Sequence, residues 1–377
     1  MFLRPLESIP WSCCSPLLRV TVPSGAINQW KLLGSGTINT FMLTTDTTPH
    51  TQTGHVATRI KNKMATPVQT IETTHRDMIH DAQLDYYSRR LATCSSDRSI
   101  KVYDVTESQH TLSAEIGGHD GPVWQVDWAH PRFGTLLASC GYDQRIIVHS
   151  EVRPNYNQPA QWNPFYKYDG HKSSVNSISW APNEYGLILA AASSDGTVSW
   201  HKHVDGTHWE HNAFTAGLTG CNAVSWAPYK APGTMQGDGE NTSYTLKLVT
   251  GSCDGVARIW SKQATEDNFI MVQSFKNHHT DWVRDVAWAP TSSSPTNTVA
   301  TCSEDKTVWI HKETTDGWQS IKLPDFEKPV WRVSWSITGN VLAVSTGEQE
   351  VTLWKESIDH LWVQLSGLEH QQQEQKQ

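Results

Sequence analysis

The sequence predicts an all-β chain folded as a six-bladed β-propeller, and three recurring features support this prediction. The first is a tight turn with an acidic residue at the end of a short apolar strand. It occurs six times, at Asp97, Asp143, Asp195, Asp254, Asp305 and Glu348. Successive acids are 46, 52, 59, 51 and 43 residues apart. A four-stranded blade occupies about 40–45 residues, so each turn marks one blade.

The second feature is a strand that ends in tryptophan, about 13–15 residues ahead of most of the acids. These tryptophans are Trp128, Trp180, Trp226, Trp288 and Trp335. A large apolar residue lies two positions earlier, as Val126 does before Trp128, so both side chains project from one face of the strand. Because the residue between them is small or polar, neighbouring blades can interlock. We therefore expect the tryptophans to pack blades together rather than to bind a ligand.

The third feature is a histidine that precedes the strand, at His119, His171 and His279. A histidine at this place can donate a hydrogen bond to the acid of the turn. Gly217 stands at the corresponding place in the fourth repeat, which therefore lacks this bond. The repeats end in tryptophan only at Trp260 and Trp354, and elsewhere in Tyr103, His149, His201 and His311. Together the three features are typical of WD repeats, although their final residues are degenerate.

Charge and cysteine usage limit the kind of partner and compartment. The chain has 377 residues and a net charge of −8, which argues against direct binding of nucleic acid. Residues 1–63 carry about +4, which leaves about −12 for the remainder. Cys94, Cys140 and Cys302 occupy equivalent positions in different blades, too distant to bridge, so we expect buried free thiols in a reducing compartment. No apolar run is long enough to predict a membrane-spanning segment.

We divide the chain into three parts. Residues 64–370 form the predicted propeller. Residues 1–63 match no blade, and we interpret them as an extension that is disordered or absent from the native protein, with Met64 as the working start. Residues 371–377 are rich in glutamine and are expected to be a disordered tail.

No catalytic, cofactor-binding or metal site is predicted. The chain lacks a phosphate-binding loop, a His-Glu-x-x-His motif and a paired Cys-x-x-Cys motif. Four histidines lie within eleven residues, at His201, His203, His208 and His211, and could in principle bind zinc. However, His201 occupies the terminal position of its repeat and an Asp-Gly turn separates it from His208. The acids of the turns are explained as hydrogen-bonding turn residues.

The predicted ring is open. The first blade begins with its own inner strand near Asp77–Tyr86, and the sixth ends with its own outer strand near Ile358–Leu365, so no spare strand is evident to close the ring. An open ring leaves an apolar face and a strand edge at each end, and a partner normally covers such edges. Strands donated by a partner would bind by edge pairing. The expected edge residues are Ile79, Asp81, Leu84, Trp354, Leu361 and Val363.

Several segments closely resemble the Sec-thirteen family, which provides the small WD-repeat subunit of the COPII outer coat and is shared with the Y-shaped nuclear pore scaffold. These segments are Met78–Tyr87, Leu91–Asp97, Gly121–Pro131, Asp281–Trp288 and Gly339–Ala343. The resemblance covers about residues 75–370 and does not include residues 1–63. His149, His201 and His311 depart from the usual repeat end.

The resemblance implies an open six-bladed propeller completed by a seventh blade from an α-solenoid partner. In the coat this partner is the large outer-coat subunit, and in the pore it is a scaffold nucleoporin. A vacuolar nutrient-signalling complex also uses the family. The implied locations are the cytoplasmic face of the endoplasmic reticulum membrane, COPII vesicles, the nuclear pore complex and the vacuole membrane.

Three alternatives remain open at this point. A paralogous propeller of the nuclear pore and nutrient-signalling complexes would have a similar open ring. A ubiquitin-ligase substrate receptor would carry Trp-Asp-x-Arg repeat ends, whereas Trp260 and Trp354 are followed by Ser-Lys and Lys-Glu. A propeller hydrolase would need clustered acids in its channel.

Overall fold

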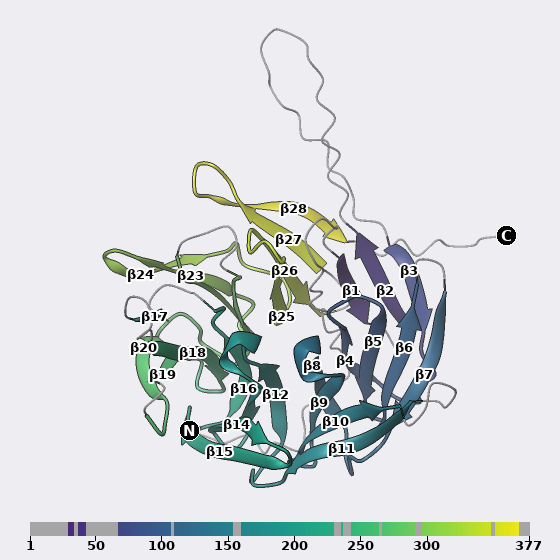
Figure 1. Ribbon diagram of the computed structural model, residues 1–377. Coiled ribbons are helices and arrows are strands. Elements are labelled where there is room, and N and C mark those ends of the chain that lie inside the picture. Colours follow the sequence, from purple (N-terminus) through teal and green to yellow (C-terminus); the bar gives the residue numbers. More distant parts are fainter. Residues whose placement is uncertain are drawn as a thin grey trace, which may run out of the picture.

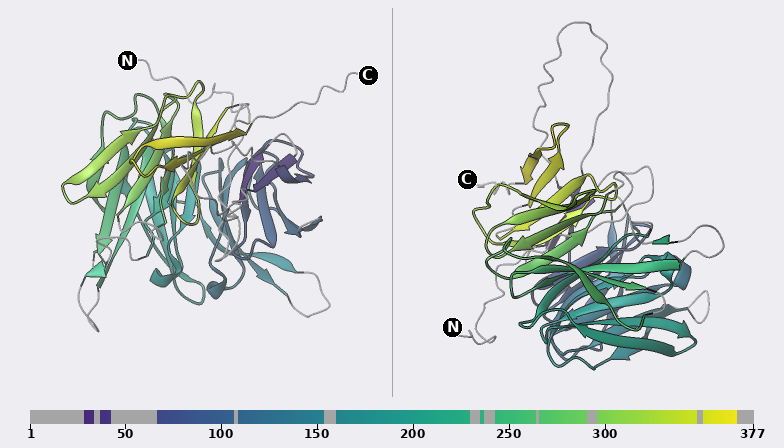
Figure 2. Two further views of the ribbon diagram at one scale, coloured as in Figure 1. Left: turned by 90° about the horizontal axis from the view of Figure 1, so that it is seen from above. Right: turned by 90° about the vertical axis from the view of Figure 1, so that its left-hand side faces the viewer.

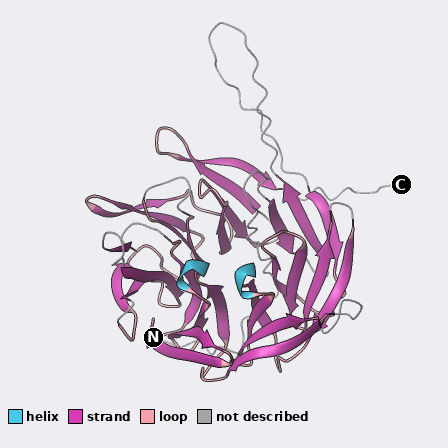
Figure 3. Cartoon of the chain, viewed as in Figure 1, coloured by secondary structure: helices cyan, strands magenta, loops and turns pink. Residues whose placement is uncertain are grey.

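The computed structural model consists almost entirely of β-strands arranged around a central axis (Figure 1). It describes residues 29–33, 37–42, 67–106, 109–153, 160–229, 235–236, 243–263, 266–290, 296–347 and 351–368. Two short 3₁₀ helices, η1 (Pro131–Phe133) and η2 (Asn183–Tyr185), are the only helices within these residues (Figure 3). Each follows the innermost strand of its blade.

Six antiparallel sheets form the blades. Blade one contains β4 (Ile79–Leu84), β5 (Arg90–Ser95), β6 (Ile100–Val105) and β7 (His110–Ile116). Blade two contains β8 (Val123–Trp128), β9 (Leu136–Gly141), β10 (Ile146–Val152) and β11 (Gln161–Tyr168). Blade three contains β12 (Val175–Trp180), β13 (Ile188–Ser193), β14 (Thr197–Asp205) and β15 (His208–Thr215).

The remaining blades follow the same plan. Blade four contains β16 (Cys221–Trp226), β18 (Ser243–Ser252), β19 (Ala257–Gln263) and β20 (Ile270–Phe275), and β17 (Met235–Gln236) pairs with β18. Blade five contains β21 (Val283–Trp288), β22 (Thr298–Ser303), β23 (Val308–Thr314) and β24 (Gly317–Lys322). Blade six contains β25 (Val330–Trp335), β26 (Val341–Thr346), β27 (Val351–Glu356) and β28 (Trp362–Leu368). The predicted six-bladed β-propeller is confirmed.

The acidic turns join the second strand of a blade to the third. The residue after the acid has a positive φ in five blades: Arg98 (70°), Gln144 (67°), Gly196 (84°), Gly255 (74°) and Lys306 (68°). This left-handed conformation costs little for glycine, which explains why glycine follows the acid in two of the five turns. The acid itself is held by hydrogen bonds described below.

The cores lie between blades, because each sheet presents alternate side chains to its two neighbours. One cluster combines Ala190, Ala192 and Val198 of blade three with Val224 and Trp226 of blade four. Equivalent clusters join the other successive blades. Small residues on one sheet accommodate large residues on the next, as the sequence pattern predicted.

A further sheet lies in the gap between blade six and blade one (Figures 1 and 2). It contains three antiparallel strands in the order β1 (Gln29–Leu33), β2 (Thr37–Met42) and β3 (Pro67–Glu72). Its strand β1 lies beside β4, the innermost strand of blade one. We call the space between blade six and blade one the seventh position.

This sheet differs from the sequence expectation in two respects. Residues 1–63 contain the two strands β1 and β2, although they were expected to contribute nothing to the propeller. The chain also has a spare strand, β3, although none was expected. Both were overlooked because this stretch carries no acidic-turn or tryptophan marker. The expected tail, residues 371–377, and the turn residue Glu348 lie outside the described residues.

Candidate partner interface

A hydrogen-bonded histidine and acid fix the edge of four blades. His119 Nδ1 lies 3.0 Å from Asp143 Oδ1, and its Nε2 lies 2.9 Å from Ser139 Oγ. The same arrangement links His171 to Asp195 and Ser199, and His279 to Asp305, Thr307 and Thr301. Burial lowers the pKa of His171, while hydrogen bonds lower the pKa of all four acids despite their burial. The acids thus stay ionised and serve as structural acceptors.

The fourth histidine, His75, belongs to blade one and was missed in the sequence. Its Nδ1 lies 2.9 Å from Asp97 Oδ2, and its Nε2 lies 2.7 Å from Thr93 Oγ1. It follows threonine, whereas His119 and His171 follow glycine, and this difference concealed it. In blade four, which lacks the histidine as predicted, Asp254 instead pairs with Arg258 Nη2 at 2.5 Å.

Four of the tryptophans connect their blade to the previous one through the indole N–H group. Trp128 donates to the carbonyl of Gln83 at 2.9 Å, and Trp180 donates to that of Asp127 at 3.0 Å. Trp226 and Trp335 make the same bond, to Ser179 and Ala287. The indole of Trp288 is buried without such a partner. The tryptophans therefore pack and align neighbouring blades.

The order of strands identifies β3 as an outer strand without inner strands of its own repeat. In blades one, two and four, the outermost strand directly precedes the histidine of the following blade, as β7 precedes His119. Strand β3 precedes His75 in the same way. By this rule β3 is the fourth, outermost strand of a seventh blade. The six repeats do not supply the three inner strands of that blade.

The inner strands of consecutive blades contact one another around the ring, from β4 through β8, β12, β16 and β21 to β25. No comparable contact joins β25 back to β4 in the part of the chain that the structure describes. The six repeats therefore do not close on themselves, as the sequence predicted, and the β1–β3 sheet lies in the opening between blade six and blade one.

Blade one presents an apolar face to the seventh position. Ile79, Leu84, Leu91 and Tyr103 form a buried cluster with Ile71 of β3. Two of the expected edge residues, Ile79 and Leu84, thus lie where a seventh blade meets blade one. Asp81 was also expected there, but its carboxylate accepts a hydrogen bond from the Val126 amide at 3.3 Å and so faces blade two. The β-bulge between Ile79 and Asp81 turns it away from the edge.

Blade six lies on the other side of the seventh position and presents a second apolar face to it. Trp354 was expected at this edge, but it packs with Leu342 and Val344 against blade five. Because side chains alternate along a strand, Ala343, Val351 and Leu353 face the seventh position, where they are 0–1% exposed. Leu361 and Val363 are 66% and 45% exposed, at the start of the outer strand β28. That strand ends at Leu368, three residues beyond the expected end.

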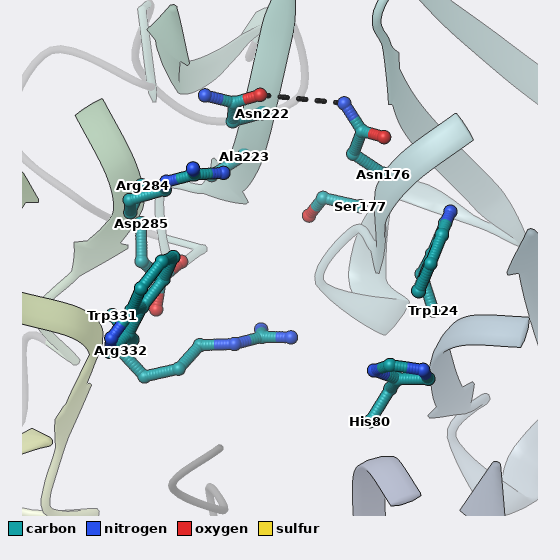
Figure 4. Close-up of a pocket in the computed structure, with 10 residues that line it drawn as sticks. All are labelled: His80, Trp124, Asn176, Ser177, Asn222, Ala223, Arg284, Asp285, Trp331 and Arg332. Atoms are coloured by element: carbon teal, nitrogen blue, oxygen red, sulfur yellow. Dashed lines mark hydrogen bonds between the residues drawn. The ribbon is translucent and has the colours of Figure 1, made fainter. Parts of the chain in front are cut away.

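The channel contains a buried charge cluster near the same opening. Burial raises the pKa of Asp81, and it raises that of Asp285 to about 6, although the Arg332 guanidinium opposes both shifts. Arg332 extends across a pocket of about 90 Å³, with His80, Trp124 and Trp331 around it (Figure 4). Arg284 packs between Trp282 and Trp331, its guanidinium carbon 4.9 and 4.8 Å from the two ring centroids. This pocket is far smaller than the roughly 300–1,000 Å³ typical of cofactor sites.

The histidine-rich stretch has a packing role. His201 lies opposite His211 in the β14–β15 pair and its Nδ1 is 3.0 Å from the Tyr166 hydroxyl. Among the described residues, no group of three or more His, Cys, Asp or Glu side chains is placed to hold a metal ion. Cys94, Cys140, Cys221 and Cys302 are buried free thiols. None of the helices in the described part is long and apolar enough to cross a membrane.

These features define the class of the protein as a WD-repeat propeller of six blades whose ring the repeats themselves do not close. A family model described as "WD domain, G-beta repeat" matches residues 65–104, 107–150, 162–201 and 269–312.

Curated relatives specify the family. The chain is 43% identical to the protein SEC13 homolog of Drosophila melanogaster over 80% of this chain and 84% of the relative. It is 42% identical to the protein transport protein sec13 of Emericella nidulans, over 78% of this chain and 96% of the relative. It is 41% identical to the protein transport protein SEC13 of Mycosarcoma maydis, over 79% of this chain and 94% of the relative. The chain belongs to the Sec13 family, as the sequence resemblance indicated.

Proposed function

We propose that this chain is a non-enzymatic scaffold subunit of the COPII outer coat, which forms vesicles that travel from the endoplasmic reticulum to the Golgi. Family membership supports the transport role, since the relatives are named protein transport proteins. The chemistry of the turns supports a structural role, because the acids of four blades accept hydrogen bonds from histidine and backbone amides.

The observation that carries the proposal is β3, an outer strand that lacks inner strands from the repeats. A partner that donates three strands would pair with β3 and complete a four-stranded seventh blade. Its two faces would cover Ile79 and Leu84 on blade one, and Val351 and Leu353 on blade six. Backbone pairing together with apolar burial is the usual basis of binding by strand addition.

The proposed donor is the large α-solenoid subunit of the outer coat. We extend the proposal to a scaffold nucleoporin of the Y-shaped nuclear pore complex and to a vacuolar nutrient-signalling complex, because the same open edge would accept a blade from each. The corresponding locations are the cytoplasmic face of the endoplasmic reticulum, its vesicles, the nuclear pore and the vacuole membrane.

Affinity purification of the full tagged chain from its own cells tests the proposal. We expect it to recover the large outer-coat subunit. Leu353→Glu should reduce this recovery at least tenfold, because it places a charge on the apolar face of blade six. Leu112→Glu is the matched control, since Leu112 is 45% exposed on β7, and it should leave recovery unchanged.

Circular dichroism and thermal unfolding must show that Leu353→Glu remains folded, and Leu353→Ala provides a milder variant. Equal recovery by the folded Leu353 and Leu112 variants would contradict the proposed edge. Purification without any helical-repeat subunit would contradict the scaffold role itself.

A further inference from the structure

Strands β1 and β2 already lie in the space that the proposed function reserves for a partner. Their pairing is regular: Gln29–Leu33 matches Met42–Ile38 residue for residue, and β2 then pairs with β3 from Thr37↔Glu72 to Phe41↔Pro67. The order from the axis outward is β1, β2, β3, as in the other blades. The hairpin of β1 and β2, residues 29–42, thus supplies two of the three missing inner strands.

The surroundings of the seventh position support this arrangement. Ile71 of β3 is fully buried against blade one, and Val351 and Leu353 of blade six are 0–1% exposed although no seventh repeat covers them. Figures 1 and 2 show the β1–β3 sheet beside both blades. The hairpin contains one charged residue, Lys31, and residues 64–377 carry about −12, so its positive charge does not oppose docking.

We propose that the hairpin of residues 29–42 is a built-in occupant of the seventh position, which a blade donated by a partner must displace. The two occupants exclude each other because β3 has one inner row of N–H and C=O groups, and β2 uses it. This inference rests on the proposed function and adds a means of regulating it.

The hairpin can compete because it belongs to the same chain. Residues 43–66 connect it to β3 in sequence, and a short connection gives an effective concentration on the order of millimolar. In the part of the chain that the structure describes, the sheet it forms has three strands, whereas the main path of each blade has four, so a donor of three strands would pair with β3 in a more complete blade. If the hairpin is docked in about nine molecules of ten, the apparent affinity for a partner falls about tenfold.

The hairpin lies outside the family pattern. The WD-domain model first matches at residue 65, after β2. The relative from Emericella nidulans matches over 96% of its own length but over only 78% of this chain. The inference therefore concerns this chain and is not a property taken from its relatives.

A disulfide lock on the full chain tests the inference. Thr40 and Gln69 are opposite each other in the β2–β3 pair, so Thr40→Cys/Gln69→Cys can join the hairpin to β3. The probe is the purified large outer-coat subunit from the same organism, with binding measured by biolayer interferometry. We expect the oxidised lock to bind at least tenfold more weakly than its reduced form. Lys202→Cys/Glu210→Cys is the control, because it cross-links β14 to β15 in blade three.

A proline substitution tests the opposite direction. Ile38→Pro removes a backbone donor near the start of β2 and should release the hairpin, so binding should strengthen about tenfold. Val56→Pro, in the connecting residues, is the matched control and should bind as the wild type does.

The outcomes separate the two proposals. Equal affinities for the oxidised lock, its reduced form and Ile38→Pro would overturn the displacement inference and leave the scaffold role intact. If no variant binds the probe, the scaffold role is contradicted.

In that case disulfide formation in Thr40→Cys/Gln69→Cys still tests whether the hairpin pairs with β3. Failure of Thr40→Cys/Gln69→Cys to form its disulfide on oxidation would overturn the hairpin's occupancy of the seventh position, and efficient formation would support it.

Discussion

Buried histidines replace tryptophan at three repeat ends, and the reason is visible at the level of single residues. His201 is fully buried between the Tyr166 hydroxyl and Ser199 Oγ, and His311 is fully buried with Ser320 Oγ 2.8 Å from its Nδ1. His311 also stacks on Phe275, with ring centroids 3.8 Å apart. The sequence could not predict this fit, since Tyr166 and Phe275 come from the previous blade and Ser320 from a neighbouring strand. At His201 and His311 the departure from the repeat consensus is therefore accommodated by hydrogen bonds and ring stacking.

These histidines predict a specific response to acid. Burial lowers the pKa of His149 to about 4 and lowers those of His201 and His311 well below the usual 6.5. The unfolded chain binds protons at these sites below pH 6.5 while the folded chain does not. The free energy of unfolding therefore has its full value above pH 6.5. It decreases as the pH drops towards 4, by about 1.4 kcal/mol per pH unit for each such histidine.

Urea denaturation between pH 7.5 and 4 measures this slope. His149→Phe should reduce it by about one histidine's share, because the variant has no group to titrate there. A free energy of unfolding that stays constant from pH 7 to pH 4.5 would contradict this account. The turn acids act in a lower range, since their lowered pKa values make their contribution disappear only below about pH 4.

Four innermost strands, β8, β12, β16 and β25, are aligned with the previous blade by the indole of their terminal tryptophan. The sequence predicted the packing role correctly from two-residue periodicity. It could not predict the hydrogen bonds to the carbonyls of Gln83, Asp127, Ser179 and Ala287, because their geometry depends on the angle between blades.

Two tryptophans with nearly equal burial separate the hydrogen bond from the packing. Trp335 and Trp288 are 3% and 2% exposed, but only the indole of Trp335 donates, to Ala287 at 3.0 Å. We expect Trp335→Phe to destabilise the protein by about 1 kcal/mol more than Trp288→Phe, since it also removes the hydrogen bond to the carbonyl of the half-buried Ala287. Thermal and urea unfolding of both variants measure the difference. Equal losses would show that the indole bond adds nothing to packing.

The edge strands show where prediction from sequence fails. Ile79 and Leu84 follow from the alternation in β4 and lie at the opening. Asp81 was misplaced because a β-bulge shifts the register of β4. Trp354 was misplaced because the sequence of its strand does not show which of the two faces of blade six packs against blade five. The strand β3 was missed because it carries no marker of its own, and because the histidine of blade one that follows it, His75, is preceded by threonine and was not recognised.

At the scale of the whole molecule, the chain is a six-bladed ring with a seventh position between blade six and blade one. The number of blades followed from the spacing of six acids, because a blade has a nearly constant length. The contents of the gap did not follow, since pairing between β2 and β3 joins segments separated by residues 43–66, which contain no repeat marker. The proposed scaffold role would use a rigid ring and one edge that can exchange its strands.

Hydrogen–deuterium exchange of the full chain, with and without the large outer-coat subunit, tests the use of the seventh position most directly. The account predicts that Thr37–Met42 loses protection when the subunit binds, while Pro67–Glu72 keeps its protection because a donated strand replaces β2. Unchanged protection of both segments in a saturated complex would contradict it, because the subunit would then bind elsewhere on the propeller.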